Sequence, residues 1–258
     1  MSARNSHANK TAARERLRVE RERQAKKDKV RRQLTVGVSA VALLAVAGGA
    51  GYLVVQANKP PQWEAAKDKA LVKPANTSGE NGTTISLGKG KTVVDVYEDM
   101  RCPACAAFEQ TTGESLKKGA TDGKFTLKVH LGSIIDGNMG GSGSKNAISA
   151  LGAALDVSTE AFVQYHSLLY SGDHHPEETK DEFADDAYLL KVADNVKALK
   201  GNAAFKDAMD KGTYDKWALE MVEQFNTAGI KGTPTIRIDG KDVDQDSLPA
   251  ELQKLGVA

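Results

Sequence analysis

The two cysteines of this 258-residue chain, Cys102 and Cys105, stand three positions apart in the sequence VVDVYEDMRCPACAAFEQ. A run rich in β-branched residues precedes them and a helix-forming run follows, so the pair is predicted to lie where a strand gives way to a helix. Four interpretations fit such a pair: a redox-active dithiol, half of a metal site, a small structural disulfide, or packing.

Redox chemistry is the interpretation that the local sequence favours. Cys102 is predicted to be the last residue before the helix, and Cys105 to lie one turn inside it. Unpaired N–H groups and the positive end of the helix dipole then surround the first sulfur, so its pKa is predicted to fall below the free value of about 8.5. Pro103 suits a first helical turn. Small Ala104 and Ala106 leave room for a substrate chain, and the less exposed Cys105 is expected to resolve a mixed disulfide.

The other interpretations find less support. Zinc needs two further ligands, and no histidine lies at a finger-like spacing from the cysteines. A disulfide that closes so short a loop removes little unfolded-state entropy and stabilises weakly. His166 is predicted to be a packed or edge histidine, and His174 and His175 to lie in a surface loop. We therefore expect neither a metal nor a cofactor.

A second segment, GIKGTPTIRIDG at 229–240, carries a proline directly before a predicted strand. Together with the cysteine pair it suggests a cis peptide bond between Thr233 and Pro234. A cis proline turns the preceding backbone outward, where Thr233 can pair main chain to main chain with an extended substrate. Such pairing accepts many sequences, which suits an enzyme that acts on unfolded proteins.

Hydrophobic periodicity predicts the elements that position these residues. Strands are predicted at TTISLG, KTVVDVYED, FTLKVHLG (125–132, with one apolar side) and TPTIRIDGKDV, the last with a two-residue turn at Asp239–Gly240. Helices are predicted at 144–155, 158–172, 181–201, 202–211, 214–229 and 247–256, the second capped by Ser158. The order predicts an α/β fold in which a helical block interrupts the strands.

The N-terminal region differs from the remainder in charge and hydropathy. Residues 1–33 carry a net charge of +8, against +1 for the whole chain, and residues 34–55 form a run of 22 without a charge. A helix of that length rises roughly 33 Å, enough to cross a membrane. The basic residues before it predict a single-pass anchor at the cell membrane, with a cytoplasmic N-terminus and an extracytoplasmic remainder. A cleaved signal peptide, with AVA at 45–47 as its cleavage site, is the alternative.

This topology divides the rest of the chain. The basic tail, 1–33, is expected to touch anionic lipid head groups, and no nucleic acid is expected as a partner. Residues 56–82 hold three of the seven prolines and end in polar turn formers, which indicates a linker with a short helix at 63–71. The globular domain is predicted to span 83–258.

These motifs resemble the thioredoxin superfamily, and more closely its DsbA-like branch of extracytoplasmic thiol–disulfide oxidoreductases. VVDVYEDMRCPACAAFE is similar to that branch's strand, active site and helix, EAFVQYHSLLYSG to a helix of its inserted domain, and AGIKGTPTIRIDGK to its cis-proline segment. The resemblance covers about residues 83–258. It implies a thioredoxin fold with a helical insertion at about 140–229.

The resemblance also implies an activity. Cys102 and Cys105 would be the catalytic pair that oxidises dithiols of reduced or unfolded exported proteins, with Thr233 and Pro234 binding the substrate. A membrane partner such as a quinone-linked oxidase would reoxidise the enzyme. A disulfide reductase, an isomerase, and a redox-inactive binding module of the same fold stay open as alternatives.

Two departures from the family pattern bear on the redox potential. Pro103 and Ala104 stand between the cysteines, without the histidine of the most strongly oxidising members. These two residues are therefore expected to tune the pair toward a weaker oxidant. Thr233 precedes the proline, as in some isomerases, and its hydroxyl could approach the sulfurs and shift their potential.

A third departure concerns a carboxylate. The family often has a buried acid six residues before the first cysteine, where it assists proton transfer to or from the second. Val96 occupies that position here. Asp95, Glu98 and Asp99 are nearby, and the sequence leaves open whether any of them takes its place.

Overall fold

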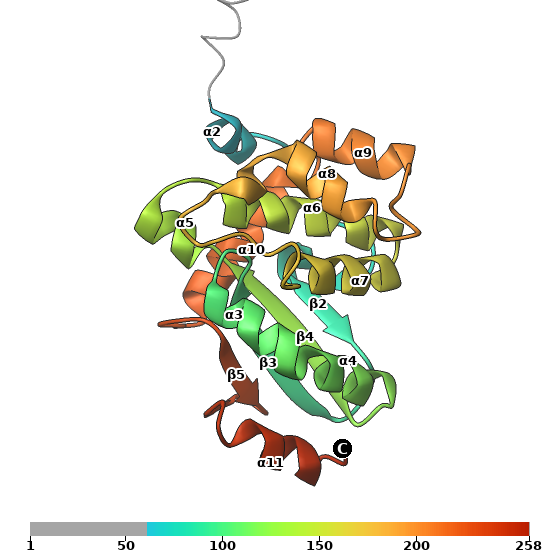
Figure 1. Ribbon diagram of the computed structural model, residues 1–258, viewed down its shortest axis with the longest axis vertical. Coiled ribbons are helices and arrows are strands. Elements are labelled where there is room, and N and C mark those ends of the chain that lie inside the picture. The colour runs from blue at the N-terminus through green and yellow to red at the C-terminus, as the bar shows by residue number, and fades with distance from the viewer. Residues whose placement is uncertain (1–60, 258) are drawn as a thin grey trace, which may run out of the picture. The chain divides into compact units, whose positions relative to one another are not determined.

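The computed structural model describes residues 61–257, which fold around one mixed sheet with strand order β1-β2-β4-β3-β5-β6 (Figure 1). Its strands are β1 (Thr77–Ser78), β2 (Thr84–Leu87), β3 (Thr92–Asp99), β4 (Phe125–Gly132), β5 (Thr235–Ile238) and β6 (Lys241–Val243). The central strands β3 and β4 pair in parallel, whereas the other four neighbouring pairs are antiparallel. The predicted α/β class is confirmed.

Strand periodicity explains the buried face of the sheet. Along β4, the alternate apolar residues Phe125, Leu127, Val129 and Leu131 are all at most 4% exposed, as the sequence predicts. At the other edge, the β5–β6 hairpin turns at Asp239 and Gly240, whose φ angles are 48° and 79°. Both values are left-handed, as a tight hairpin turn requires.

Helices cover both faces of the sheet. The segment after β3 forms α3 (Pro103–Phe108), a single π-helical turn η2 (Glu109–Gly113) and α4 (Glu114–Thr121), which lie in front of β3 and β4 in Figure 1. Helix α10 (Asp215–Thr227) covers the opposite face, where Phe225 meets Tyr97 of β3 edge-on with the ring centroids 5.8 Å apart. The last helix, α11 (Leu248–Lys254), is buried through Leu248 and Leu252.

The helical insertion lies between β4 and β5, as predicted. It comprises α5 (Ile134–Met139), α6 (Gly143–Val157), α7 (Thr159–Leu169), η3 (Glu182–Ala184), α8 (Asp186–Ala193), α9 (Ala203–Asp210) and α10. Ser158 caps α7 as expected, accepting a hydrogen bond from the Ala161 N–H. Helix α6 forms its centre, and Gly152 packs so closely on Trp217 that a Cβ there would lie 2.8 Å from the ring. A side chain at this position would therefore force α6 and α10 apart.

The single helix predicted over 181–201 is wrong. The chain forms η3 and α8 instead, and α8 ends at Ala193. Asp185 begins α8 anew by accepting a hydrogen bond from the Ala187 N–H. Beyond α8, the Asn195 side chain donates to carbonyl groups of the last turn at 3.1 and 3.3 Å, which competes with helix continuation.

Residues 61–82, for which the sequence predicts a linker, pack onto the domain. They form α2 (Gln62–Lys67), strand β1 and a 3₁₀ turn η1 (Glu80–Gly82). Gln62 and Lys69 both bind the buried carboxylate of Asp215, at 3.1 and 3.2 Å. The prolines and polar residues of this segment are typical of a flexible linker. Here, however, Gln62 and Lys69 bind the Asp215 carboxylate of the helical insertion and so hold the segment against the domain.

The predicted basic tail, 1–33, and the predicted transmembrane segment, 34–55, lie outside the described residues, as do residues 56–60 of the predicted linker. Within residues 61–257, no helix combines the length and the apolar character that crossing a membrane requires.

Candidate active site

Cys102 is the residue immediately before α3, as the sequence predicts. Its backbone is extended, with φ −77° and ψ 119°, and Pro103 begins the helix. Its N–H donates to the Asp99 carbonyl at 2.9 Å, and its own carbonyl accepts from the Ala106 N–H at 3.1 Å. Both cysteines are free thiols, Cys102 7% exposed and Cys105 fully buried. The first sulfur is thus the one within reach of a partner.

The surroundings of Cys102 favour its thiolate. A hydrogen bond from the Cys105 thiol is the largest cause, and together with bonds from the Thr233 side chain and two α3 backbone N–H groups it outweighs burial, lowering the pKa of Cys102 to about 6. The predicted depression is confirmed. The helix start contributes as expected, but the second thiol contributes more.

The surroundings of Cys105 act in the opposite direction. Burial raises its pKa far above the usual range, and the adjacent Cys102 sulfur and the negative charge of Glu98 raise it further. Near neutral pH the site therefore holds one thiolate and one thiol. This asymmetry suits a nucleophile in front and a resolving group behind.

Iodoacetamide is expected to alkylate only Cys102 in the native reduced protein. Because the thiolate is the reacting form, the rate should follow a single titration with its midpoint near pH 6, in line with the pKa of about 6. Mass spectrometry after proteolysis measures which cysteine carries the label at each pH. A midpoint near the free-thiol value of about 8.5, or equal labelling of Cys105, would contradict this assignment.

The Thr233–Pro234 bond is cis, as predicted, and it faces the cysteines. The Thr233 carbonyl oxygen lies 3.5 Å from Cys102 Sγ, although 131 positions separate the two residues. Pro234 is buried and Thr233 half-buried. Pairing of β5 with β3 brings this peptide unit to the start of α3.

The residues that border Cys102 at the surface differ in one respect from the prediction that Ala104 and Ala106 leave room for a substrate. Pro103 and Ala104 are exposed, so the dipeptide between the cysteines borders the reactive sulfur. Ala106 is only 4% exposed and belongs to the core. Room for a substrate therefore comes from Pro103 and Ala104 rather than from Ala106.

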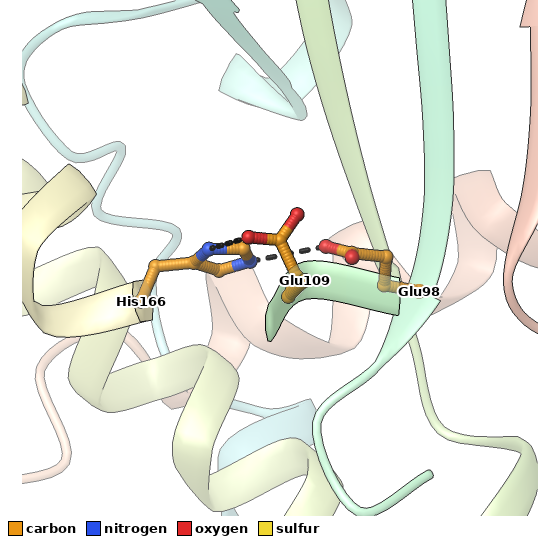
Figure 2. A group of neighbouring side chains, drawn as sticks. All are labelled: Glu98, Glu109 and His166. Atoms are coloured by element: carbon orange, nitrogen blue, oxygen red, sulfur yellow. Dashed lines mark hydrogen bonds and ion pairs between the residues drawn. The ribbon is translucent and has the colours of Figure 1, made fainter. Parts of the chain in front are cut away.

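A buried polar network lies below the cysteine pair, and the sequence did not reveal it. Figure 2 shows the two nitrogens of the His166 ring each paired with a different carboxylate: Nε2 is 3.0 Å from Glu98 Oε2, and Nδ1 is 3.8 Å from Glu109 Oε2. Lys117 Nζ lies 2.9 Å from that same Glu109 oxygen and 2.8 Å from Ser167 Oγ. Burial raises the pKa of Glu98 to about 7, and the charge of Glu109 adds to the effect.

One sequence signal could have identified Glu98, although not its partners. Val94, Val96 and Glu98 alternate on the buried side of β3, so a carboxylate occupies an inward-facing strand position. Of the three candidate acids, Asp95 points to the other face and pairs with His130 at 2.8 Å. The Asp99 carboxylate accepts three hydrogen bonds from neighbouring groups. Glu98 is the acid whose charge raises the pKa of Cys105.

A second buried network holds the loop before α3. Asp99 accepts hydrogen bonds from the N–H groups of Arg101 and Ile135 and from the Ser144 hydroxyl. The Arg101 guanidinium, 3% exposed, binds Asp136 at 2.9 Å, the Gly140 carbonyl at 2.8 Å and the Glu178 carbonyl at 3.1 Å. The residue directly before Cys102 is therefore fixed to the helical insertion.

The comparisons with known proteins agree with this geometry. A model of the thioredoxin family matches residues 80–255. Oxidised DsbA from Mycobacterium tuberculosis is 25% identical, with 67% of this chain and 92% of that chain covered and a TM-score of 0.57. The disulfide bond oxidoreductase DsbG of the same organism is 26% identical, with 75% and 86% covered and a TM-score of 0.56.

A more distant solved structure, BdbD from Bacillus subtilis, shares the fold at 20% identity, with 71% of this chain and 98% of that chain covered and a TM-score of 0.55. No curated protein sequence matches. The family match extends over more than half of the chain. This chain therefore belongs to the thioredoxin family, and its architecture is that of the DsbA-like members.

Proposed function

We propose that this protein is an extracytoplasmic protein thiol–disulfide oxidoreductase that oxidises substrate dithiols through Cys102 and Cys105. The observation that carries the proposal is the arrangement of three groups: a thiolate-forming Cys102 at the start of α3, the Thr233 carbonyl 3.5 Å from its sulfur, and a buried Cys105 thiol behind it. Two of the similar structures, a DsbA and a disulfide bond oxidoreductase, support the same reaction class.

The reaction begins from the Cys102–Cys105 disulfide. A substrate thiolate attacks Cys102 Sγ, the enzyme S–S bond breaks, and Cys105 leaves as a thiolate that takes up a proton. A second substrate thiolate then attacks the substrate sulfur of the mixed disulfide and releases Cys102. The substrate loses two electrons and gains a disulfide, while the enzyme gains the same two electrons as a dithiol. With a pKa of about 6, Cys102 is a good leaving group near neutral pH.

Thr233 and Pro234 are proposed to hold the substrate. The half-buried Thr233 lies beside the reactive sulfur, where a passing extended segment would pair with its backbone. Exposed Pro103 and Ala104 offer no charge and no bulky side chain on the neighbouring surface. Main-chain recognition beside a small apolar surface suits reduced and unfolded proteins of many sequences.

The oxidising direction rests on which form the site stabilises. A hydrogen-bonded Cys102 thiolate stabilises the reduced protein above pH 6, and stabilising the reduced form makes the disulfide a stronger oxidant. The missing histidine between the cysteines acts in the other direction. We therefore propose an oxidant of moderate strength, with a reductase or isomerase as the alternative.

The proposed location comes from the sequence alone. A basic tail with a net charge of +8 followed by 22 uncharged residues supports a membrane anchor with the catalytic domain outside the cytoplasm. A protein so placed would meet reduced exported proteins as substrates and a membrane partner, such as a quinone-linked oxidase, that reoxidises it. Its basic tail would meet anionic lipid head groups.

Equilibration of the full-length protein in detergent with glutathione buffers of graded potential tests the direction. We expect a potential of about −120 to −180 mV, the range of oxidants and isomerases of this fold, together with disulfide formation in reduced, denatured ribonuclease A. A potential near −270 mV without ribonuclease oxidation would identify a reductase instead. Recovery of activity only from a scrambled ribonuclease would identify an isomerase.

A further inference from the structure

We propose that the cavity between α8 and α9 binds an anionic phospholipid of the membrane, with an acyl chain inside the cavity and the phosphate against lysines at its rim. The inference rests on the membrane anchor of the proposed function, because that anchor brings the domain to the lipid. It concerns a part of the helical insertion that the thiol chemistry does not use, and it assigns the side of the domain that faces the membrane.

The cavity lies where the chain turns from α8 into α9, and its volume is about 360 Å³. Helix α8 ends at Ala193 and α9 begins at Ala203, so two short helices replace one continuous helix and leave a gap between them. The buried part of the lining includes Leu199 and Phe205, each 2% exposed, whereas Ala203 is exposed. A mainly apolar cavity of this volume, open to the surface, is suited to a hydrocarbon chain.

The segment that forms the cavity is positively charged, although the domain as a whole is acidic. Residues 190–206 hold four lysines and one acid, a net charge of +3. Subtracting +8 for residues 1–33 and +1 for Lys59 from the +1 of the whole chain leaves −8 for residues 61–258. A local excess of positive charge on an acidic domain favours an anionic ligand at this surface.

Three of the four lysines are available to a ligand. Lys191, Lys197 and Lys200 are exposed, and none of them forms an ion pair with another residue of 61–257. Lys191 and Lys200 each directly follow a residue that lines the cavity, whereas Lys206 lines it but already binds Asp210 at 2.6 Å. The start of α9 adds the positive end of its dipole. Positive charge beside an apolar cavity matches the two parts of an anionic amphiphile.

The path of the chain favours a membrane lipid as that amphiphile. Only residues 56–60 separate the proposed span, 34–55, from Pro61, and five residues reach at most about 18 Å. The start of α2 therefore stays close to the bilayer. Figure 1 shows α2, α8 and α9 at the same end of the domain, with α11 at the opposite end. The cavity thus lies at the end of the domain where the chain enters it.

Other occupants of the cavity find less support. The basic tail, 1–33, has the same sign of charge as the lysines, and the proposed topology places it on the other side of the membrane. A second copy docked through the same surface would bring two positively charged segments together. Substrate proteins are proposed to bind at Thr233, and none of the residues that line the cavity belongs to β5 or α3.

Acetylation of individual lysines, measured by mass spectrometry, tests the contact with the phosphate. The full-length protein is compared in nanodiscs of phosphatidylcholine alone and in nanodiscs that also contain phosphatidylglycerol. Lys191, Lys197 and Lys200 should react at least about five-fold more slowly in the anionic nanodiscs, because each lysine near an anionic surface gains about that factor in binding. Lys254 of α11 should react equally in both. High salt should reduce the protection, since it screens the charges.

Two matched variants test the cavity itself. Ala203→Trp fills the cavity from its exposed edge, whereas Ala204→Trp adds the same side chain at the next exposed position, which does not line it. In Ala203→Trp the lysines should react in anionic nanodiscs as fast as in phosphatidylcholine, and Ala204→Trp should keep the protection. The alkylation midpoint of Cys102 should stay near pH 6 in both variants, which shows that the domain remains folded.

Equal acetylation in the two kinds of nanodisc would overturn the proposal. So would protection that survives in Ala203→Trp, because charge alone would then account for it. Protection in detergent that appears on adding reduced insulin chains would assign the cavity to a substrate protein instead. Protection in detergent that rises with protein concentration would assign it to a second copy.

Failure of the proposed function would look different. A protein without the anchor would be released from membranes by washing with alkaline carbonate. A protein without exchange activity would show the same protection of Lys191, Lys197 and Lys200, while oxidation of reduced ribonuclease A would be absent.

Discussion

Cys102→Ser is expected to lower the rate of thiol–disulfide exchange by at least about 1,000-fold, both in insulin reduction and in oxidation of reduced ribonuclease A. A serine hydroxyl forms no disulfide. Cys105 does not take over, because its side chain is fully buried and its surroundings hold it as a thiol. Retention of more than a small fraction of activity would mean that the chemistry does not pass through Cys102.

Cys105→Ala is the partner variant, and it should separate attack from resolution. Cys102 keeps its access to substrate, but nothing resolves the mixed disulfide, so covalent adducts with substrate should accumulate on non-reducing gels. The hydrogen bond from the Cys105 thiol is the largest cause of the lowered Cys102 pKa, so the alkylation midpoint should move above pH 6. An unmoved midpoint and no adducts would instead support a binding module whose cysteines do no exchange.

Local rules explain why the reactive centre could be predicted from the sequence. A proline one position after Cys102 begins a helix, and a β-branched run before it makes a strand, so the location of the first sulfur follows from short-range preferences. The cis bond before Pro234 and the Asp239–Gly240 turn are likewise properties of neighbouring residues. Such features are encoded within a few positions of where they act.

The buried networks could not be predicted because they depend on contacts between distant elements. Glu98 and His166 are 68 positions apart and meet only because α7 of the insertion packs beside η2, the π-helical turn after α3. In the sequence, His166 looks like a histidine beside an apolar stripe, and nothing local marks its partner. The hydrogen bond from Lys69 to Asp215 likewise depends on a contact between distant elements, because the two residues are 146 positions apart.

Arg101→Met is expected to destabilise the protein by about 3–5 kcal/mol, the cost of breaking a buried ion pair from one side. The guanidinium is 3% exposed and its main partner Asp136 is 2% exposed, so removal leaves this buried carboxylate with only the more distant Lys145, at 3.7 Å, as a counter-charge. It also releases the carbonyl groups of Gly140 and Glu178. Urea denaturation of the full-length protein measures the loss, as a lower midpoint with an unchanged slope.

Lys206→Met provides the matched control, because it removes a Lys–Asp210 ion pair whose side chains are 60% and 51% exposed. Exposed pairs contribute little, so this change should stay within about 0.5 kcal/mol. Asp136 also accepts hydrogen bonds from the N–H groups of Ser144 and Lys145, at 3.0 and 3.1 Å. A loss below about 1 kcal/mol in Arg101→Met would therefore mean that these backbone groups and the Lys145 ammonium, 3.7 Å away, satisfy the carboxylate without Arg101. A larger loss would mean that Arg101 joins the loop before Cys102 to the insertion, making the stability of the two parts interdependent.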